Sequence, residues 1–188
     1  MTMAEIAPAE AIRLFEERMA QGRYREAAKI REDYSLSAEP LQDAVRREYS
    51  RVLGIGEYSL AAELAKEYGL SKKMVVEAAS RSFVRKVDGE QYKAAAEFAK
   101  KYDLPPEMVR EAAIRAYNKS MDFGLAKNAA DIAVDFELPD DMRIAAAEKA
   151  FAAHMDSGLY NKALKVAREY GLSPDLLREA ETKAKGRR

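Results

Sequence analysis

Cysteine and tryptophan are absent from this 188-residue sequence, and histidine occurs only once, as His154. Without cysteine the chain can form no disulfide, no thiolate nucleophile and no cysteine-ligated zinc site. No suitable partner repeats near His154, so we interpret it as a half-exposed structural residue rather than a metal ligand or a catalytic base. Glycine-rich phosphate-binding loops are missing as well. The sequence therefore predicts no enzyme activity, no metal and no cofactor.

The sequence also has no long apolar run and no excess of charge of one sign. Charged residues interrupt each apolar stretch well before the roughly 20 residues that a membrane span requires. No basic segment precedes an apolar run at the N-terminus, as a signal peptide would need. The 32 basic and 32 acidic residues balance, which argues against a whole-protein field that gathers nucleic acid or anionic lipid. We expect a cytoplasmic protein without a membrane segment.

What the sequence does contain is a repeat of 34 residues. When the chain is aligned with itself at that spacing, one column holds only alanine, and a column seven residues later holds only aromatic residues. The alanines are Ala27, Ala61, Ala95, Ala129 and Ala163, and the aromatic residues are Tyr34, Tyr68, Tyr102, Phe136 and Tyr170. Within each copy the apolar positions recur at intervals of three and four residues, which predicts one face of an α-helix.

A second, longer helix is predicted in each copy. Its aromatic column consists of Phe15, Tyr49, Phe83, Tyr117 and Phe151, and its small column consists of Ala44, Ala78, Ala112, Ala146 and Ala180. A Leu-Ser or Leu-Pro connection precedes this helix, where serine can cap the first turn and proline is tolerated. The turn that follows is marked by glycine in most copies, namely Gly22, Gly56, Gly124 and Gly158.

These columns predict an all-α fold, an α-solenoid of about five 34-residue antiparallel helical hairpins preceded by an N-terminal half repeat. We expect one domain, 1–188, with the half repeat at 8–20 and the repeats at about 22–54, 56–88, 90–122, 124–156 and 158–184. Neighbouring hairpins would bury their alanines and aromatic rings against each other. No alternating apolar pattern predicts a strand. Polar replacements in the end helices, such as Glu10 and Glu181, are typical of capping repeats and favour a monomer.

The segments Gly22–Ala27 and Gly158–Ala163 resemble the second-helix motif of tetratricopeptide repeats, which also have 34 residues per copy. The resemblance extends over roughly residues 8 to 184, although the first helix lacks the Trp-Leu-Gly-Tyr series of that family. It implies a non-catalytic scaffold that binds a protein or peptide partner in a concave groove lined by the first helix of each hairpin.

A basic column on the exposed face of the longer helices is the most distinct polar feature. Its members are Arg13, Arg47, Arg81, Arg115, Lys149 and Lys183. One interpretation is a positive row that binds an acidic peptide segment or a phosphate backbone. The other is a set of intrahelical ion pairs, because acidic residues stand four positions before Arg47, Arg81, Arg115 and Lys183.

Two aliphatic residues, Val84 and Ile114, lie on the same predicted face near the middle of the chain. We predict a partner-binding groove that consists of Arg47, Arg81, Val84, Ile114, Arg115, Asn118 and Lys149. Isolated surface aliphatics also need no functional explanation. RNA binding through the basic column is the alternative function, although the balanced charge and the acidic neighbours weaken it.

Overall fold

The computed structural model describes residues 7–186, which contain eleven α-helices and no strand. Consecutive helices pack against each other, so the predicted all-α arrangement of successive helical hairpins is confirmed. The chain divides into two compact units, Met1–Ser82 and Phe83–Arg188. We call them unit 1 and unit 2. The expectation of a single domain stays a prediction. In the described part of the chain, no helix has both the length and the apolar character that a bilayer crossing demands.

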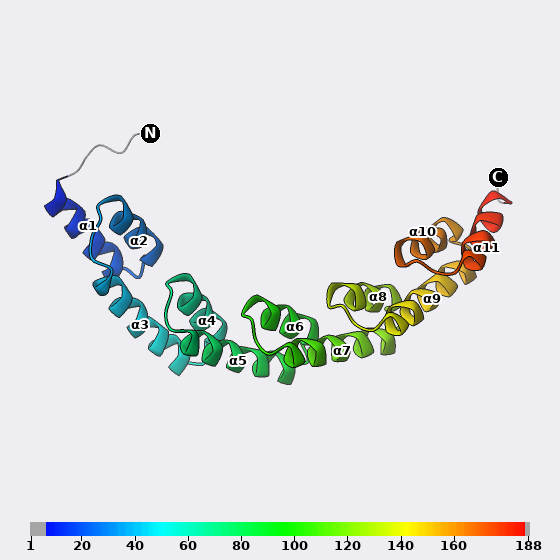
Figure 1. Ribbon diagram of the computed structural model, residues 1–188, viewed down its shortest axis with the longest axis horizontal. Coiled ribbons are helices and arrows are strands. Elements are labelled where there is room, and N and C mark those ends of the chain that lie inside the picture. Colours follow the sequence, from blue (N-terminus) through cyan, green and yellow to red (C-terminus); the bar gives the residue numbers. More distant parts are fainter. Residues whose placement is uncertain (1–6, 187–188) are drawn as a thin grey trace. The chain divides into compact units, whose positions relative to one another are not determined.

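Unit 1 begins with the lone helix that the sequence predicts. Its helices are α1 (Pro8–Ala20), α2 (Tyr24–Asp33), α3 (Glu39–Gly54), α4 (Tyr58–Glu67) and the first part of α5 (Lys72–Asp88). Helix α1 packs on α2, and α3 packs on α4 (Figure 1). A short and a longer helix therefore alternate along the chain, as the repeat predicts.

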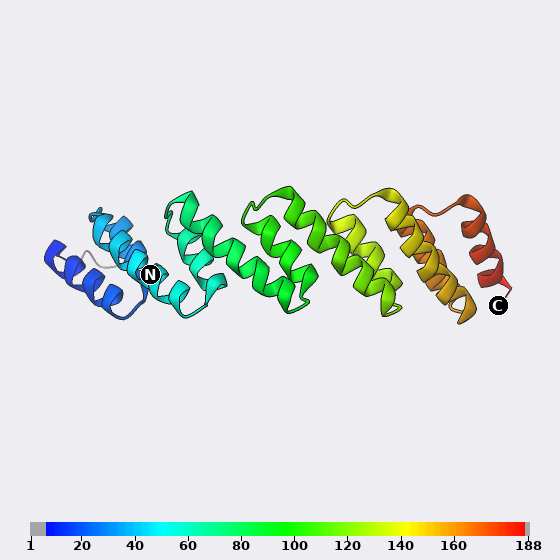
Figure 2. The same ribbon diagram turned by 90° about the horizontal axis from the view of Figure 1, so that it is seen from below.

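Unit 2 contains the end of α5 and six further helices. These are α6 (Tyr92–Lys101), α7 (Pro106–Asp122), α8 (Ala126–Asp135), α9 (Asp140–Asp156), α10 (Tyr160–Tyr170) and α11 (Pro174–Lys185). From α6 onward, each helix packs on the next one in the sequence. Within this unit the short helices α6, α8 and α10 form one layer and the longer helices α7 and α9 a second (Figures 1 and 2).

Alanine allows this close packing of helices. All five members of the first alanine column are fully buried, from Ala27 in α2 to Ala163 in α10. A methyl side chain lets neighbouring helix axes approach, and the buried rings of the longer helices fill the remaining space. Two of these rings also carry a hydroxyl that ties one longer helix to the next. Tyr49 Oη donates to the carbonyl of Met74 at 2.9 Å, and Tyr117 Oη donates to that of Met142 at 2.9 Å.

Each of the ten connections between these helices contains one residue in the left-handed conformation. Six of the ten are glycines, and the other four are Ser35, Glu90, Asp103 and Glu137, with φ between 51° and 54°. The next residue then bonds back to the preceding helix, as in the contact from Leu104 N to Ala99 O at 3.0 Å. This Schellman-type ending turns the leucine of the Leu-Ser or Leu-Pro connection inward. Serine caps the following helix, as predicted, at Ser71 and Ser173.

Ion pairs join successive short helices within each unit. In unit 1, Arg25 Nε of α2 lies 2.6 Å from Glu67 Oε1 at the end of α4. In unit 2, Lys93 of α6 lies 3.4 Å from Asp135 of α8, and Lys127 of α8 lies 3.5 Å from Glu169 of α10. The two partners are 42 residues apart in each case. The same pairing therefore recurs in three of the repeats.

A buried tyrosine extends this pairing between α8 and α10. The Tyr170 hydroxyl donates a hydrogen bond to the carboxylate of Asp131 and accepts one from Lys127 Nζ at 3.0 Å. Burial of the ring, and then the bond to Asp131, raises the pKa of Tyr170 to about 12. Because the phenol is held in its neutral form, the folded state binds this proton more tightly than the unfolded chain does.

We expect the stability of unit 2 to fall at alkaline pH. The contribution of Tyr170 is complete below its unfolded pKa of about 10 and is lost as the pH rises toward its folded value. Above pH 10 the parent protein should therefore lose about 1–2 kcal/mol more of its unfolding free energy than the Tyr170→Phe variant does. Urea unfolding at several pH values measures this loss, and absorbance at alkaline pH reports the ionisation of the phenol. Equal losses in the variant and in the parent protein would contradict the assignment.

Candidate functional site

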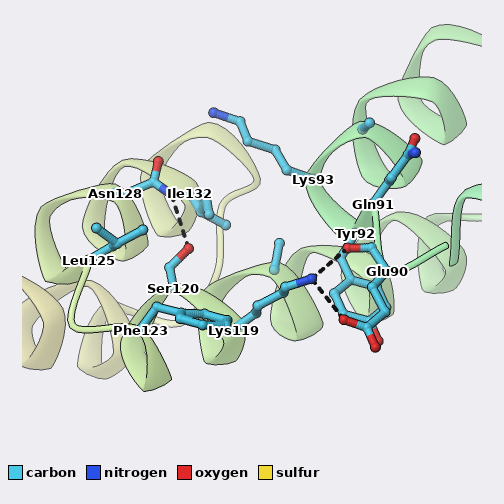
Figure 3. Close-up of a pocket in the computed structure, with 12 residues that line it drawn as sticks. Glu90, Gln91, Tyr92, Lys93, Lys119, Ser120, Phe123, Leu125, Asn128 and Ile132 are labelled. Carbon is cyan, nitrogen blue, oxygen red and sulfur yellow. Dashed lines mark hydrogen bonds and ion pairs between the residues drawn. The ribbon is translucent and has the colours of Figure 1, made fainter.

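An open cleft of about 270 Å³ lies in unit 2 between the start of α6, the end of α7 and α8. We call it the α6–α8 cleft (Figure 3). Tyr92 of α6 and Ile132 of α8 form apolar walls, and Ala116 of α7 lines the cleft as well. The first turn of a short helix, the last turns of a longer helix and the next short helix therefore build one cleft, because successive hairpins pack side by side.

The turn between α7 and α8 places two large apolar side chains beside this cleft. Phe123 is 72% exposed and Leu125 is 56% exposed, and both line the cleft. Gly124 lies between them in the left-handed conformation, and Leu125 N donates to Ser120 O at 2.8 Å, which fixes the turn. Exposed apolar side chains next to a concave apolar surface are typical of a protein-interaction site.

Polar groups occupy the mouth of the cleft. Lys119 Nζ donates to Glu90 Oε2 at 2.9 Å and to the Glu90 carbonyl at 3.2 Å, and it lies 5.5 Å from the centre of the Tyr92 ring. Asn128 Nδ2 donates to Ser120 Oγ at 3.0 Å on the other side (Figure 3). The amine of Lys119 is therefore held at the edge of an apolar surface and above an aromatic ring, where a negatively charged group could reach it.

Glu90 is unusual for its position in the repeat. The corresponding residue is glycine in the other four turns of this kind, whereas Glu90 adopts the left-handed conformation with φ 54°. A non-glycine residue in that conformation costs on the order of 1 kcal/mol, and an exposed ion pair such as the one with Lys119 returns about 0–1 kcal/mol. The ion pair therefore does not exceed the backbone cost, and glutamate gains no stability over glycine at this turn.

Unit 1 contains a cleft at the corresponding position, 68 residues earlier in the sequence. It has a volume of about 290 Å³ and lies between α2 and α4, with Tyr24 and Leu64 in the places of Tyr92 and Ile132. Its charged lining residues are two arginines and three glutamates, which give a net charge of −1: Arg23, Arg25, Glu26, Glu63 and Glu67. The α6–α8 cleft is lined by Lys93, Lys119 and Glu90, with a net charge of +1. The two clefts thus share walls from successive short helices and differ in charge, and only the α6–α8 cleft is also lined by a longer helix and the turn after it.

A larger cleft of about 540 Å³ lies at the other end of the same helices in unit 2, between the α6–α7 and α8–α9 connections. Lys100 and Arg110 line it together with Asp103 and Glu137, so its charges are mixed. None of the large exposed apolar side chains lies in it. The α6–α8 cleft is therefore the better candidate for recognition of a partner.

The basic column of the longer helices makes many of the ion pairs that its sequence neighbours predict. Arg81 lies 3.0 Å from Glu77, Arg115 lies 2.6 Å from Glu111, and Lys183 lies 3.4 Å from Glu179. Arg47 is the exception, because Asp43 pairs with Arg46 instead, at 3.5 Å. For most of these positions the intrahelical interpretation explains the charge without a ligand.

Two of these arginines also cover a tyrosine of the preceding short helix. The guanidinium of Arg81 lies 5.8 Å from the centre of the Tyr58 ring, and that of Arg115 lies 5.9 Å from the centre of the Tyr92 ring. Ala126 replaces the tyrosine in the next repeat. There the basic residue is Lys149, whose amine lies 3.4 Å from the carbonyl of Met121 at the end of α7. At these three positions the basic residue therefore contacts the preceding hairpin, and the contact differs where alanine replaces the tyrosine.

The remaining predicted site residues lie apart from the clefts. Val84 in α5 is 52% exposed, Ile114 in α7 is half-buried and Asn118 is exposed. The predicted groove residues are divided between the units, with Arg47 and Arg81 in unit 1 and the other five in unit 2. None of the seven lines a cleft described above. Their role in partner binding stays a prediction.

The site residues predicted from the sequence do not include Glu90, Phe123 or Leu125. The signal that could have found them is departure from the repeat rather than agreement with it. Glu90 interrupts a column of glycines, and Phe123 stands where other copies have glutamine, isoleucine, glycine or serine. A residue that serves the stacking of repeats is needed in every copy, so a side chain that differs in one copy is a better indication of a local role.

In residues 7–186 no group of three or more acidic or histidine side chains is placed to hold a metal ion. His154 is half-buried on α9. Comparison with protein-family models, with curated proteins and with solved structures gave no match for this chain.

Proposed function

We propose that this protein is a non-catalytic, tetratricopeptide-like scaffold that binds a segment of a partner protein in the cytoplasm, as a monomer. In unit 2 the segment would insert an apolar side chain into the α6–α8 cleft, between Tyr92 and Ile132. The observation that carries the proposal is the exposure of Phe123 and Leu125 at the edge of that cleft. Burial of these two side chains by a partner would remove apolar surface from water, which is the main favourable term in protein association.

The size of the cleft supports a side chain as its occupant. At about 270 Å³ it lies just below the roughly 300–1,000 Å³ that is usual for small-molecule and cofactor sites. An anchoring aliphatic or aromatic side chain contributes about 1.5–3 kcal/mol when it becomes fully buried. Interfaces commonly depend on a few such anchors that are surrounded by polar contacts. Lys119, Glu90 and Asn128 would supply that polar rim.

RNA binding has less support than the protein scaffold. It depends on a basic column that is free to meet phosphates, whereas Arg81 and Arg115 are already engaged by carboxylates and tyrosine rings. A salt-dependent shift of mixed-sequence RNA on a gel would support RNA binding, because phosphate contacts weaken steeply with salt.

A peptide selection tests the scaffold proposal. Short random peptides are displayed and selected on the whole protein, and the affinity of the best sequences is measured by fluorescence anisotropy. We expect Phe123→Ser to weaken binding by about tenfold, the loss of roughly 1.4 kcal/mol of anchor contact.

The matched control is Ile55→Ser. Ile55 is 62% exposed and occupies the position of Phe123 in the turn between α3 and α4 of unit 1. This variant should bind the peptides selected for the α6–α8 cleft as well as the parent protein does. If selection returns no peptide, or if both serine variants bind as the parent does, this cleft is not the partner site.

A further inference from the structure

The contact between Glu90 and Lys119 carries an inference about which partners the α6–α8 cleft accepts, and this inference rests on the proposed function. Glu90 places its carboxylate on the amine of Lys119 at 2.9 Å, from a backbone conformation that favours glycine. Glu90 is exposed and Lys119 is half-buried. A group from a partner can therefore reach the same amine by displacing one exposed side chain, without any movement of the helices.

The charge of the lining points to the chemistry of that group. Two lysines and one glutamate line the α6–α8 cleft, and Glu90 is the only acidic residue among them. Lys93 is engaged by Asp135 at 3.4 Å and by Glu97 at 4.0 Å, both outside the cleft. Inside the cleft, Glu90 supplies the carboxylate that contacts Lys119. When the Glu90 carboxylate is displaced, the positive amine of Lys119 lies beside an apolar wall. This combination is complementary to an acidic side chain next to an apolar one.

We propose that the α6–α8 cleft selects protein segments in which a glutamate or aspartate neighbours the apolar anchor, and that Glu90 is an internal competitor for Lys119. The peptide carboxylate takes the place of the Glu90 carboxylate. Lys119 stays at the mouth of the cleft during this exchange because it also donates to the Glu90 main-chain carbonyl at 3.2 Å. The competitor lowers the affinity for all acidic segments, so a segment needs a good apolar anchor as well.

The corresponding cleft of unit 1 gives an internal comparison. Gly22 stands there in the place of Glu90, and three glutamates line that cleft together with two arginines. Its net charge of −1, from two positive and three negative residues, disfavours an acidic segment. The preference for acidic partners is therefore assigned to unit 2 and not to the repeat as such.

Two synthetic peptides test the inference, Gly-Ser-Glu-Leu-Ser-Gly and the same sequence with Gln in place of Glu. Binding to the full-length protein is followed by NMR, from the backbone signals of Leu125 and Ile132. We expect the Glu peptide to bind roughly threefold more tightly than the Gln peptide, the range of an exposed charge pair. Glu90→Gly should raise the affinity for the Glu peptide by about threefold and leave that for the Gln peptide unchanged, while Lys119→Gln should remove the difference between the peptides.

The matched control is Glu137→Gly, which removes a glutamate with φ 51° from another turn of unit 2. It relieves the same backbone conformation without touching Lys119, so neither affinity should change. If both peptides bind equally, Phe123→Ser weakens both by about tenfold, and Glu90→Gly alters neither affinity, the competitor role is wrong and the scaffold function stands. If neither peptide shifts the signals of Leu125 and Ile132, the cleft is not a partner site, and both proposals fail.

Discussion

Replacement of Ala129 by leucine is expected to lower the free energy of unfolding of unit 2 by about 3 kcal/mol. Ala129 is fully buried in α8, which packs on both α7 and α9. A leucine adds three carbon atoms at a contact where only a methyl group fits, so either the helices separate or the side chain takes a strained rotamer. Such overpacking costs about 1–3 kcal/mol in compact cores, and the close approach of helices on both sides of α8 places this site at the upper end of that range.

The control for this experiment is Ala153→Leu. Ala153 lies on α9 and is exposed, and alanine and leucine have nearly the same helix propensity. Surface substitutions of this kind change stability by about 0.5 kcal/mol or less. Urea unfolding followed by circular dichroism measures both variants, and hydrogen exchange shows whether α7, α8 and α9 open first. A loss in Ala129→Leu no greater than that in Ala153→Leu would show that the alanine column does not set the distance between helices.

The alanine column illustrates why so much of the fold could be predicted. Each copy of the repeat makes the same contact with the next, so the residue that fits the contact must recur at the same spacing. All five alanines of the column are fully buried in the structure, and the five rings of the longer helices, from Phe15 to Phe151, are buried as well. Local helix periodicity and a repeated contact were sufficient to predict these features.

The candidate site could not be predicted in the same way. Glu90 and Lys119 are 29 residues apart, and their contact depends on how the start of one short helix lies against the end of the next longer one. A column of repeated residues contains no information on such a single contact. The predicted role of Arg81 and Arg115 likewise omitted the rings of Tyr58 and Tyr92, because the side chains that cover each other come from different columns. Sequence periodicity gives the positions that face inward, and the partners of the charged side chains require the packed structure.

The four non-glycine residues in the left-handed conformation support a second prediction of large effect, a gain in stability. Ser35, Asp103 and Glu137 adopt φ of 51° to 52°, and their side chains are exposed. Glycine adopts this conformation without the steric cost of a Cβ atom, which is on the order of 1 kcal/mol per residue. The triple variant Ser35→Gly, Asp103→Gly, Glu137→Gly should therefore gain about 3 kcal/mol in total, or roughly 6–12 °C in the midpoint of thermal unfolding.

The opposite sign is expected where glycine enters a helix. Glu97 is exposed in the interior of α6, and Glu97→Gly should cost about 1 kcal/mol, because glycine loses more backbone entropy there than other residues do. Differential scanning calorimetry of the triple variant, of Glu97→Gly and of the parent protein makes the comparison. If the triple variant melted at or below the temperature of the parent protein, the side chains at these turns would contribute to stability through contacts that the structure does not show. If it melts well above the temperature of the parent protein, the serine and acidic residues at these turns lower stability. Glu90 would then be a residue of this kind whose contact with Lys119 gives it a role in binding, as proposed above.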